Sequence, residues 1–599
     1  MIISTVTPLL NRFRTFLLLV LLSVSGFPAT RAAVSVSQFG ITWTFDRDYP
    51  VGQFANGDYW VVGPVRITSI SPKSTREKGA MLHGSMINPS VNGRQGYDSR
   101  IKNNAYSAAL NVGDNFPLLV PPGSSVLSAE SYRKPAKNND PQLRTIAILT
   151  VLQSPAPAGS FRPPYLGADK TLRWNKRDLR YDKLRSLAKV RDTPRLQEIE
   201  EHFARPWIEQ KTNWTGRFMH PGENQPTYGR DMAHVLAHGL LSLQLDYPKA
   251  AKEKLLVRMV QYGIDMYGAL KLGASWGADG GHNQGRKMPL LLAATVLNDS
   301  DMLRFADAGQ HRIFQEDQQT WYISSADVGR KLHKEDGRHR AAYTAADIGI
   351  AEWGEKHAKN PSRDGRNWDT TYRTVSGGCT AGHVLTARLM GLEQEWNWPA
   401  TFDYYERYWK EEKHRAGKGA NNIPLFVAQM WKTHRESTPA DRFDDENVAT
   451  TVWQNIPLTS QKSSFTFSFY LVPSGDKMDA ITGLSNGVAN KYADLAAAVR
   501  FAPSGMIDAR NGDSFQAANI LRYRGGVKYR VVMTVSVPKR TYSLTVTPPG
   551  EDPVVIADNW KFRNEQASTP LLSSVGFHAA KGYHAVLNPT LHPDRAQHF

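Results

Sequence analysis

The sequence predicts a multidomain α plus β protein. A central α/α toroid (barrel) is expected between an N-terminal β domain and a C-terminal jelly-roll-like β-sandwich. Three observations support this: strand-like alternation near both ends, helical periodicity in the middle, and a length of 599 residues, too great for one hydrophobic core. With 41% hydrophobic and 22% charged residues, the composition is globular and excludes a disordered or fibrous chain.

Residues 1–32 are predicted to be a secretory signal peptide. Arg12 and Arg14 precede the apolar run 15–27, and the small residues Ala32 and Ala33 offer a cleavage site. A membrane anchor is the alternative, but the run is shorter than the ~20 residues that cross a bilayer. We therefore expect a secreted or periplasmic protein without a membrane span.

The chain is strongly basic, with a formal net charge of +17. The charge becomes +14 without residues 1–32, because that segment carries three arginines and no acid. A basic exported protein attracts polyanions. Since the sequence has no recognisable nucleic-acid-binding motif and no basic tail, we expect an anionic polysaccharide as partner and no nucleic acid. The oligomeric state stays open.

Residues 33–155 alternate as β-strands do. The clearest strand patterns are 41–45, 59–62, 65–70 and 145–152, and Asn56-Gly57 is a hairpin signal between two of them. This pattern predicts a β-sandwich or a related β domain. A proline-rich connector follows at about 154–164.

Residues 165–440 change to helical periodicity and form the predicted toroid. Apolar residues recur at helical spacing in the segments 232–245, 251–272, 288–297, 301–314, 345–357, 381–392, 400–410 and 423–432. Repeated helix pairs of this kind are typical of an α/α toroid, and an irregular helical bundle is the alternative. The single cysteine, Cys379, lies in this region and excludes an internal disulfide; we expect it to be a buried thiol rather than a nucleophile.

Residues 447–599 return to strand patterns, of which 464–472, 527–535 and 541–546 are the strongest. Many strands with turn signals between them predict a jelly-roll-like β-sandwich. This end resembles the lamin-G/concanavalin-like modules appended to extracellular enzymes, a resemblance that says little about function.

The densest group of functional side chains lies in the loop 276–287. Four glycines accompany Trp276, His282, Asn283, Arg286 and Lys287, a combination suited to gripping an anionic, hydroxyl-rich ligand. A second unusual segment, 337–343, places a tyrosine beside two arginines and a histidine. We interpret the two segments as halves of one active site.

The chemistry that fits these residues is β-elimination on a 4-linked uronate. The carboxylate must be neutralised so that the C5 proton becomes removable, a base must take that proton, and an acid must protonate the departing O4. Amide and imidazole groups can stabilise the developing enediolate. A tyrosine can serve as base and acid when nearby cations favour its ionisation.

His282-Asn283, followed about sixty residues later by Tyr343 in an arginine-rich segment, resembles the arrangement in α/α-toroid polysaccharide lyases, including alginate lyases and heparinase-like enzymes. The resemblance implies that Asn283 and His282 neutralise the carboxylate, that Tyr343 is base and acid, and that Arg338 or Arg340 assists its ionisation. It further implies alginate (especially mannuronate-rich) or glucuronan as substrate, followed by glycosaminoglycans. We expect substrate contacts from Trp276, Arg286, Lys287, Tyr228, Arg230, His234, Tyr372 and Arg373.

Several alternatives remain open at this point. His282 and Asn283 can cap the helix that begins near residue 288, and Tyr343 can be a core residue. His234 and His238 have the i, i+4 spacing of a zinc site, but the glutamate of the metalloprotease motif is absent, so we expect no metal and no cofactor. Tyr372 is the reserve catalytic tyrosine. A glycoside hydrolase with paired carboxylates, or a non-catalytic glycan-binding protein, is the alternative function.

Overall fold

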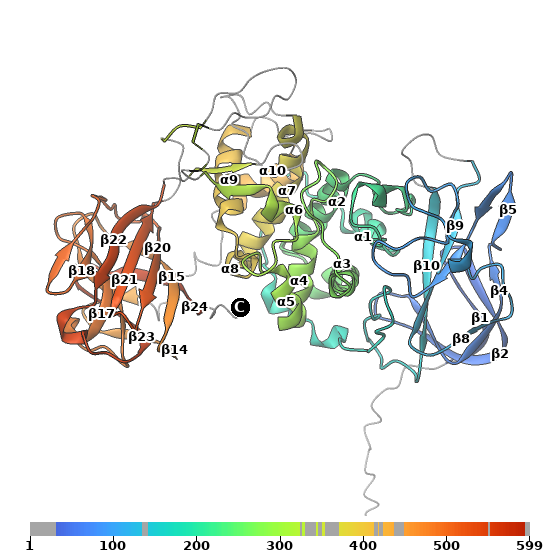
Figure 1. Cartoon of the computed structure of the whole chain (residues 1–599), viewed down its shortest axis with the longest axis horizontal. Helices are drawn as coiled ribbons and strands as arrows, with labels where there is room; N and C mark the ends of the chain where they lie inside the picture. The colour runs from blue at the N-terminus through green and yellow to red at the C-terminus, as the bar shows by residue number, and fades with distance from the viewer. Residues whose placement is uncertain are drawn as a thin grey trace, which may run out of the picture.

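The computed structural model describes residues 31–134, 142–323, 326, 328–329, 343–345, 350–353, 371–412, 417, 423–435, 448–548 and 552–593. Along the chain, N-terminal strands are followed by a helical body and then by C-terminal strands (Figure 1). The predicted signal peptide falls on residues 1–30, outside the described residues, and on Arg31 and Ala32, with which the first strand begins. No helix among the described residues combines the length and apolarity that a bilayer crossing requires.

The N-terminal strands form one eight-stranded sheet rather than two stacked sheets. Its order is β7-β9-β10-β3-β2-β4-β8, with β1 paired to β2. The sheet closes over its own core, because the Trp43 indole of β2 donates a 3.0 Å hydrogen bond to Ser128 of β9, three strands away. The strands are β1 Arg31–Gln38, β2 Ile41–Gln53, β3 Tyr59–Val62, β4 Val65–Ser71, β7 Ser85–Ile87, β8 Leu118–Val120, β9 Ser124–Ser131 and β10 Leu143–Leu152, beside a small β5–β6 ribbon, Thr75–Glu77 and Ala80–Leu82.

Strand β10 explains how this sheet joins the helices. Nearly all of its residues are buried, because both faces of the strand are covered. Leu149 and Val151 point into the core of the sheet, whereas Ile146 and Ile148 belong to the cluster that also holds the core side chains of the helices. The sheet and the helical body therefore share one hydrophobic core.

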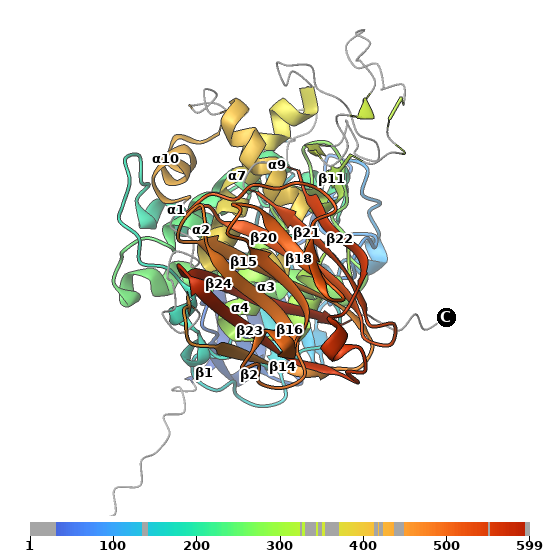
Figure 2. The ribbon, with the colours of Figure 1, turned by 90° about the vertical axis from the view of Figure 1, so that its left-hand side faces the viewer.

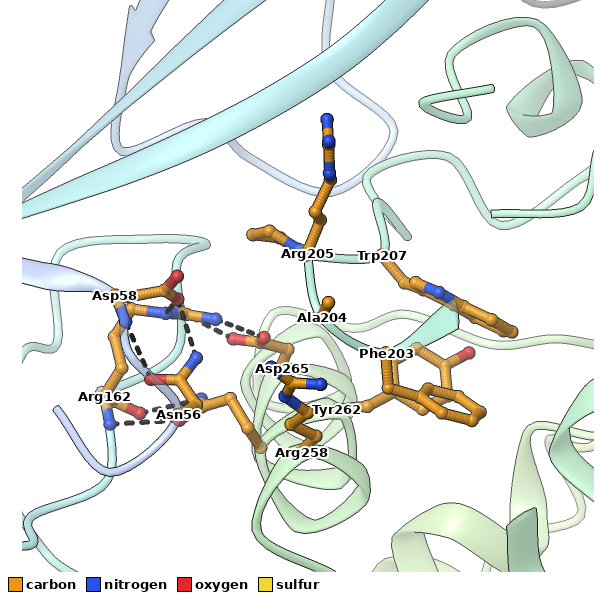
Figure 3. A pocket seen from close by; sticks show the side chains of 12 residues that line it. Asn56, Asp58, Arg162, Phe203, Ala204, Arg205, Trp207, Arg258, Tyr262 and Asp265 are labelled. Carbon is orange, nitrogen blue, oxygen red and sulfur yellow. Dashed lines mark hydrogen bonds and ion pairs between the residues drawn. The ribbon is translucent and has the colours of Figure 1, made fainter. Parts of the chain in front are cut away.

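A buried ion network strengthens the same junction (Figure 3). Arg162, which is fully buried in the connector, forms ion pairs of 2.6 Å with Asp58, in the turn between β2 and β3, and of 2.5 Å with Asp265 of helix α3. The cavity left beside this network measures about 20 Å³, the space of about one water molecule. The predicted hairpin at Asn56-Gly57 is confirmed as the link between the paired strands β2 and β3.

The helical body contains the helices that the periodicity predicts, with two exceptions. Its helices are α1 Leu196–His202, α2 Gly229–Ser242, α3 Lys249–Lys271, α4 Lys287–Leu297, α5 Ser300–Ala306, α6 Gln315–Gln318, α7 Thr371–Met390, α8 Glu393–Trp396, α9 Pro399–Glu412 and α10 Leu425–His434. Helices α2 and α7 pack together, as do α3 and α4. Closure of these helices into a toroid stays a prediction.

Two predicted helices differ from the structure in part. The segment 301–314 is helical only to Ala306, and the chain then turns at Asp307, whose side chain accepts hydrogen bonds from Gly309 and Gln310. Within 345–357, the residues Ala351–Trp353 form strand β12, which pairs with β11 (Thr320–Tyr322). Alanine-rich periodicity favoured a helix there, but pairing with a strand distant in sequence decided the outcome.

The C-terminal strands form the predicted β-sandwich, made of two six-stranded sheets. Side chains of β15 alternate strictly between buried and half-buried, as expected for a strand with one face on the core. Seen from its own side, the sandwich lies in front of the helices (Figure 2). One sheet has the order β13-β24-β15-β20-β21-β22: Val448–Ala449, His584–Pro593, Ser464–Pro473, Tyr529–Ser536, Thr541–Thr547 and Val554–Lys561. The other has β14-β23-β16-β17-β18-β19: Gln454–Gln461, Leu572–Lys581, Asp479–Ser485, Leu495–Phe501, Ile507–Asn511 and Ser514–Gln516.

Candidate functional site

The loop 276–287, which joins α3 to α4, is supported by hydrogen bonds to the short helix α6. The Gln315 amide oxygen accepts the backbone N–H of Asn283 at 2.9 Å, and the Gln315 amide nitrogen donates to the carbonyl of Gly280. Gln318 accepts the N–H of Ala278 at 2.9 Å. Two side chains of α6 thus satisfy backbone groups that a glycine-rich loop would otherwise leave unpaired.

The two acids of α6 complete this support. Glu316 accepts the N–H of Gly285 at 2.5 Å, and Asp317 pairs with the Lys287 ammonium at 2.8 Å. Burial raises the pKa of Glu316 to about 7. All four residues of α6 therefore contact the loop. This support was not predicted from the sequence, because α6 lies some thirty residues away from the loop along the chain.

Three residues predicted to touch substrate lie inside the protein instead. Trp276, Arg286 and Lys287 are 1%, 2% and 0% exposed. The Trp276 indole donates to Glu209 at 3.0 Å, and Arg286 forms a 3.3 Å ion pair with the same carboxylate. Because their polar groups are engaged by buried acids, these residues hold the loop in place rather than present groups to a ligand.

Asn283 is also mainly engaged within the loop. Its side chain is buried, and its amide nitrogen donates a 2.8 Å hydrogen bond to the carbonyl of Gly277. This bond closes the loop on itself. The capping alternative receives no support, since helix α4 begins at Lys287 with Arg286 as its N-cap and no side-chain cap.

His282, in contrast, stands among aromatic and cationic side chains, which we call the His282 cluster: Trp214, Arg217, Tyr228, Arg230 and His282. All five are half-buried. The imidazole packs edge-on against Tyr228 at 4.5 Å between ring centroids and against Trp214 at 6.1 Å. The guanidinium groups of Arg230 and Arg217 lie 5.0 and 5.7 Å from the Tyr228 ring centroid. The cluster combines stacking surface with positive charge, as a site for an acidic sugar requires.

Two glycines make this close approach possible. A Cβ atom at Gly229 would collide with the carbonyl oxygen of His282, and one at Gly281 would collide with the Tyr228 hydroxyl. The backbone N–H of Arg230 also donates to the Gly281 carbonyl at 2.9 Å. The start of helix α2 therefore rests directly on the loop.

Tyr228, Arg230 and His282 were predicted from the sequence, but Trp214 and Arg217 were missed. Both belong to the 3-10 helix Trp214–Phe218, which Asn213 caps by accepting the N–H of Thr215. An Asn-Trp-Thr-Gly-Arg run that places a tryptophan and an arginine on one short turn was the available signal.

The structure places the Tyr343 hydroxyl next to the carboxylate of Glu352. Tyr343 is 2% exposed, packs on Ile323, and its hydroxyl donates to Glu352 at 3.4 Å. Arg407 lies 3.8 Å from the same carboxylate. The predicted partners Arg338 and Arg340 lie outside the described residues. Tyr372 and Arg373 are in the first turn of α7, and their side chains are outside the described part as well.

The two histidines of α2, His234 and His238, are half-buried. Burial lowers the pKa of His234 to about 3, so its imidazole is neutral at ordinary pH, and its Nε2 atom has no hydrogen-bond partner. Within the described residues, no three His, Cys, Asp or Glu side chains are grouped as metal ligands. Cys379 is buried in α7, where its thiol donates to the Ser376 carbonyl, and burial raises its pKa to about 12.

No protein-family model matches the chain. It is 35% identical over 85 residues to a gellan lyase from a Bacillus species, which covers 14% of this chain and only 3% of that protein. The chain therefore spans a small part of the curated relative that it matches.

Matches to solved structures are weaker still. A sialidase aligns with a TM-score of 0.18 and 14% identity, over 23% of this chain and 14% of that one. Lectin II from Ulex europaeus aligns with a TM-score of 0.18 and 15% identity, over 23% of this chain and 78% of the lectin. A tetrameric galectin from the sponge Cinachyrella aligns with a TM-score of 0.16 and 15% identity, over 24% of this chain and 99% of the galectin. Such TM-scores carry no argument about this chain, so its function has to be proposed from the site.

Proposed function

We propose that this protein is an exported polysaccharide lyase that cleaves a 4-linked uronate polymer by β-elimination. The observation that carries the proposal is the His282 cluster, in which two guanidinium groups, an imidazole and a phenol surround one stretch of a rigidly supported loop. The 85-residue likeness to a gellan lyase supports the same reaction class. The basic charge of the chain supports an anionic polymer.

The proposed mechanism begins with neutralisation of the substrate carboxylate. Arg217, Arg230 and His282 are the groups that can bind it and stabilise the enediolate that forms when C5 loses its proton. The C5–H electron pair then becomes the C4–C5 double bond, the C4–O4 bond breaks, and O4 receives a proton. Asn283 takes a supporting role, because its amide already holds the loop closed.

We further propose that Tyr228, rather than Tyr343, transfers the proton. A phenol must ionise to act as a base, and neighbouring positive charge favours the phenolate whereas a carboxylate disfavours it. Tyr228 has two guanidinium groups beside its ring, whereas the hydroxyl of Tyr343 donates to Glu352. Tyr228 is also the tyrosine in ring contact with His282.

The test is an absorbance assay on polymannuronate, alginate, glucuronan and gellan. A lyase product carries a double bond conjugated to the carboxylate and absorbs in the ultraviolet, whereas a hydrolase product does not. Absence of new absorbance on every polymer would contradict the lyase proposal.

Three tyrosine variants assign the base. Tyr228→Phe should lower kcat by about 10²–10⁴-fold, the usual contribution of a general acid–base group. Tyr343→Phe should keep most of the rate, and Tyr247→Phe, at a half-buried tyrosine that contacts Lys189, is the matched control. If Tyr343→Phe abolishes turnover while Tyr228→Phe does not, Tyr343 is the base.

A further inference from the structure

A second cavity lies between the helical body and the C-terminal sandwich. It measures about 230 Å³ and is lined by residues from the end of α7, from α8 and the start of α9, and from β15 and β20 of the sandwich. Figure 1 shows this side of the sandwich, with β15 and β24, turned toward α8. We call this cavity the interdomain cleft.

On the sandwich side, Tyr470 and Arg530 face each other across neighbouring strands. They are direct partners in the β15–β20 register and point away from the sandwich core, since the buried residues Phe469 and Leu471 flank Tyr470. Among the described residues, the guanidinium of Arg530 has neither an ion pair nor a side-chain hydrogen bond. The Lys528 ammonium lies 4.6 Å from the centroid of the half-buried Tyr470 ring. Tyr470 and the Arg530 donors both line the cleft, where a ligand can contact them.

On the helical side, the polar groups come from α7, α8 and α9. Arg388 forms a 3.1 Å ion pair with Glu393 and a second with Glu406. Asp403 accepts a hydrogen bond from the Tyr322 hydroxyl, which leaves further acceptor capacity on its carboxylate. Burial, followed by the charge of Glu393 among other groups, raises the pKa of Tyr470 to about 12, which places this phenol near the helical acids and keeps it protonated.

The charges in the interdomain cleft nearly cancel. Among the charged residues that line the cleft, Arg388 pairs with Glu393, which leaves one cation, Arg530, and one anion, Asp403, on opposite walls. A purely anionic ligand would meet Asp403 unfavourably, and a cation would meet Arg530. A neutral ligand with hydroxyl groups can donate to Asp403, accept from Arg530 and place an apolar face on the Tyr470 ring.

We propose that the interdomain cleft binds a neutral sugar residue of a polysaccharide. It is distinct from the His282 cluster in position and in charge. Ser376 of α7 hydrogen-bonds to the loop carbonyl of Gly280, and Arg388 lies farther along the same helix, a rise of about 18 Å. A polymer that occupies both places would contain neutral as well as acidic residues. Binding in the cleft does not depend on the proposed elimination reaction.

The test measures binding by the full-length protein, without turnover. Cellotetraose, mannotetraose and maltotetraose are titrated into the wild type and into Arg530→Gln, Tyr470→Ala and Asp403→Asn, by calorimetry or ligand-observed NMR. At least one of the three should bind the wild type, and each variant should weaken that binding by about tenfold or more, the usual effect of losing a hydrogen bond to a charged group. Thermal unfolding of each variant shows that the fold is kept.

Arg524→Gln is the matched control, because it removes the same charge from an exposed position outside the cleft and should bind like the wild type. The proposal is overturned if no neutral tetrasaccharide binds the wild type. It is also overturned if variants on both walls bind as the wild type does, or if the cleft variants abolish binding of a uronate tetrasaccharide in place of a neutral one. A protein that binds neutral sugar but never produces unsaturated product would contradict the lyase proposal alone.

Discussion

The two β regions are joined to the helices in different ways. The N-terminal sheet shares its second hydrophobic face with the helical body and is tied to α3 through the buried Arg162. The C-terminal sandwich has a core formed by its own residues, between 449 and 586, and meets the helices across a polar cleft. The first junction serves stability, and the second leaves room for a ligand.

The largest effect is expected when the two β regions are produced separately. Residues 448–593 should fold alone and unfold cooperatively, because their core is complete. Residues 31–152 should stay unfolded, because the outer face of β10 would expose Ile146 and Ile148 to water. Circular dichroism during thermal unfolding checks both, and a cooperative transition in the N-terminal fragment would contradict the shared-core interpretation.

Arg162→Met should be the most damaging single substitution at the N-terminal junction. It leaves the carboxylates of Asp58 and Asp265 buried without their cation, at a cost of about 3–5 kcal/mol in free energy of unfolding, measured with urea. Arg173→Met is the control, because its ion pair with Asp169 is solvent-exposed and contributes below about 1 kcal/mol. Equal losses of unfolding free energy in the two variants would show that burial of the Arg162 network adds nothing to stability.

Glu316→Gln should change how stability depends on pH. The pKa of Glu316 is about 7 in the folded protein and about 4.5 when unfolded, so the folded state binds the extra proton between these values. Stability from this group is therefore present at low pH and is lost as pH rises from about 4.5 to 7. The variant should flatten that decline in the helical transition and leave the sandwich transition unchanged, as followed by calorimetry from pH 5 to 8.

The smallest effect is expected from salt. Association of a uronate polymer with the His282 cluster should weaken several-fold between low ionic strength and about 0.5 M, where the screening length falls to a few ångströms. Neutral tetrasaccharide binding in the interdomain cleft should be nearly constant over the same range. Parallel titrations measure both, and equal salt dependence would remove the distinction between the two places.

Much of the fold was predictable because burial follows a simple period. The alternation in 464–472 located a sandwich strand, and the apolar run in 145–152 located a strand covered on both faces. Strand β12 was not predictable, because its three residues are extended only by pairing with β11. Closure of the helices into a toroid depends on tertiary packing and stays a prediction.

The residue types of the candidate site were predictable from the sequence, but the directions in which their side chains point were not. Glycine density and polar side chains pointed to the loop 276–287. Which side chains face inward depends on partners distant in sequence, namely Glu209 for Arg286 and Asp317 for Lys287. Tyr228 and His282 lie more than fifty residues apart in sequence, and only the fold brings their rings together.

The two glycines beneath the His282 cluster limit how far this protein can diverge. A larger residue at Gly229 would push the start of helix α2 away from the His282 backbone, and one at Gly281 would displace the Tyr228 phenol. A methyl group at Gly229 would meet backbone atoms, whereas one at Gly281 would meet only the end of a side chain. The close seat of helix α2 on the loop therefore depends most strictly on glycine at position 229.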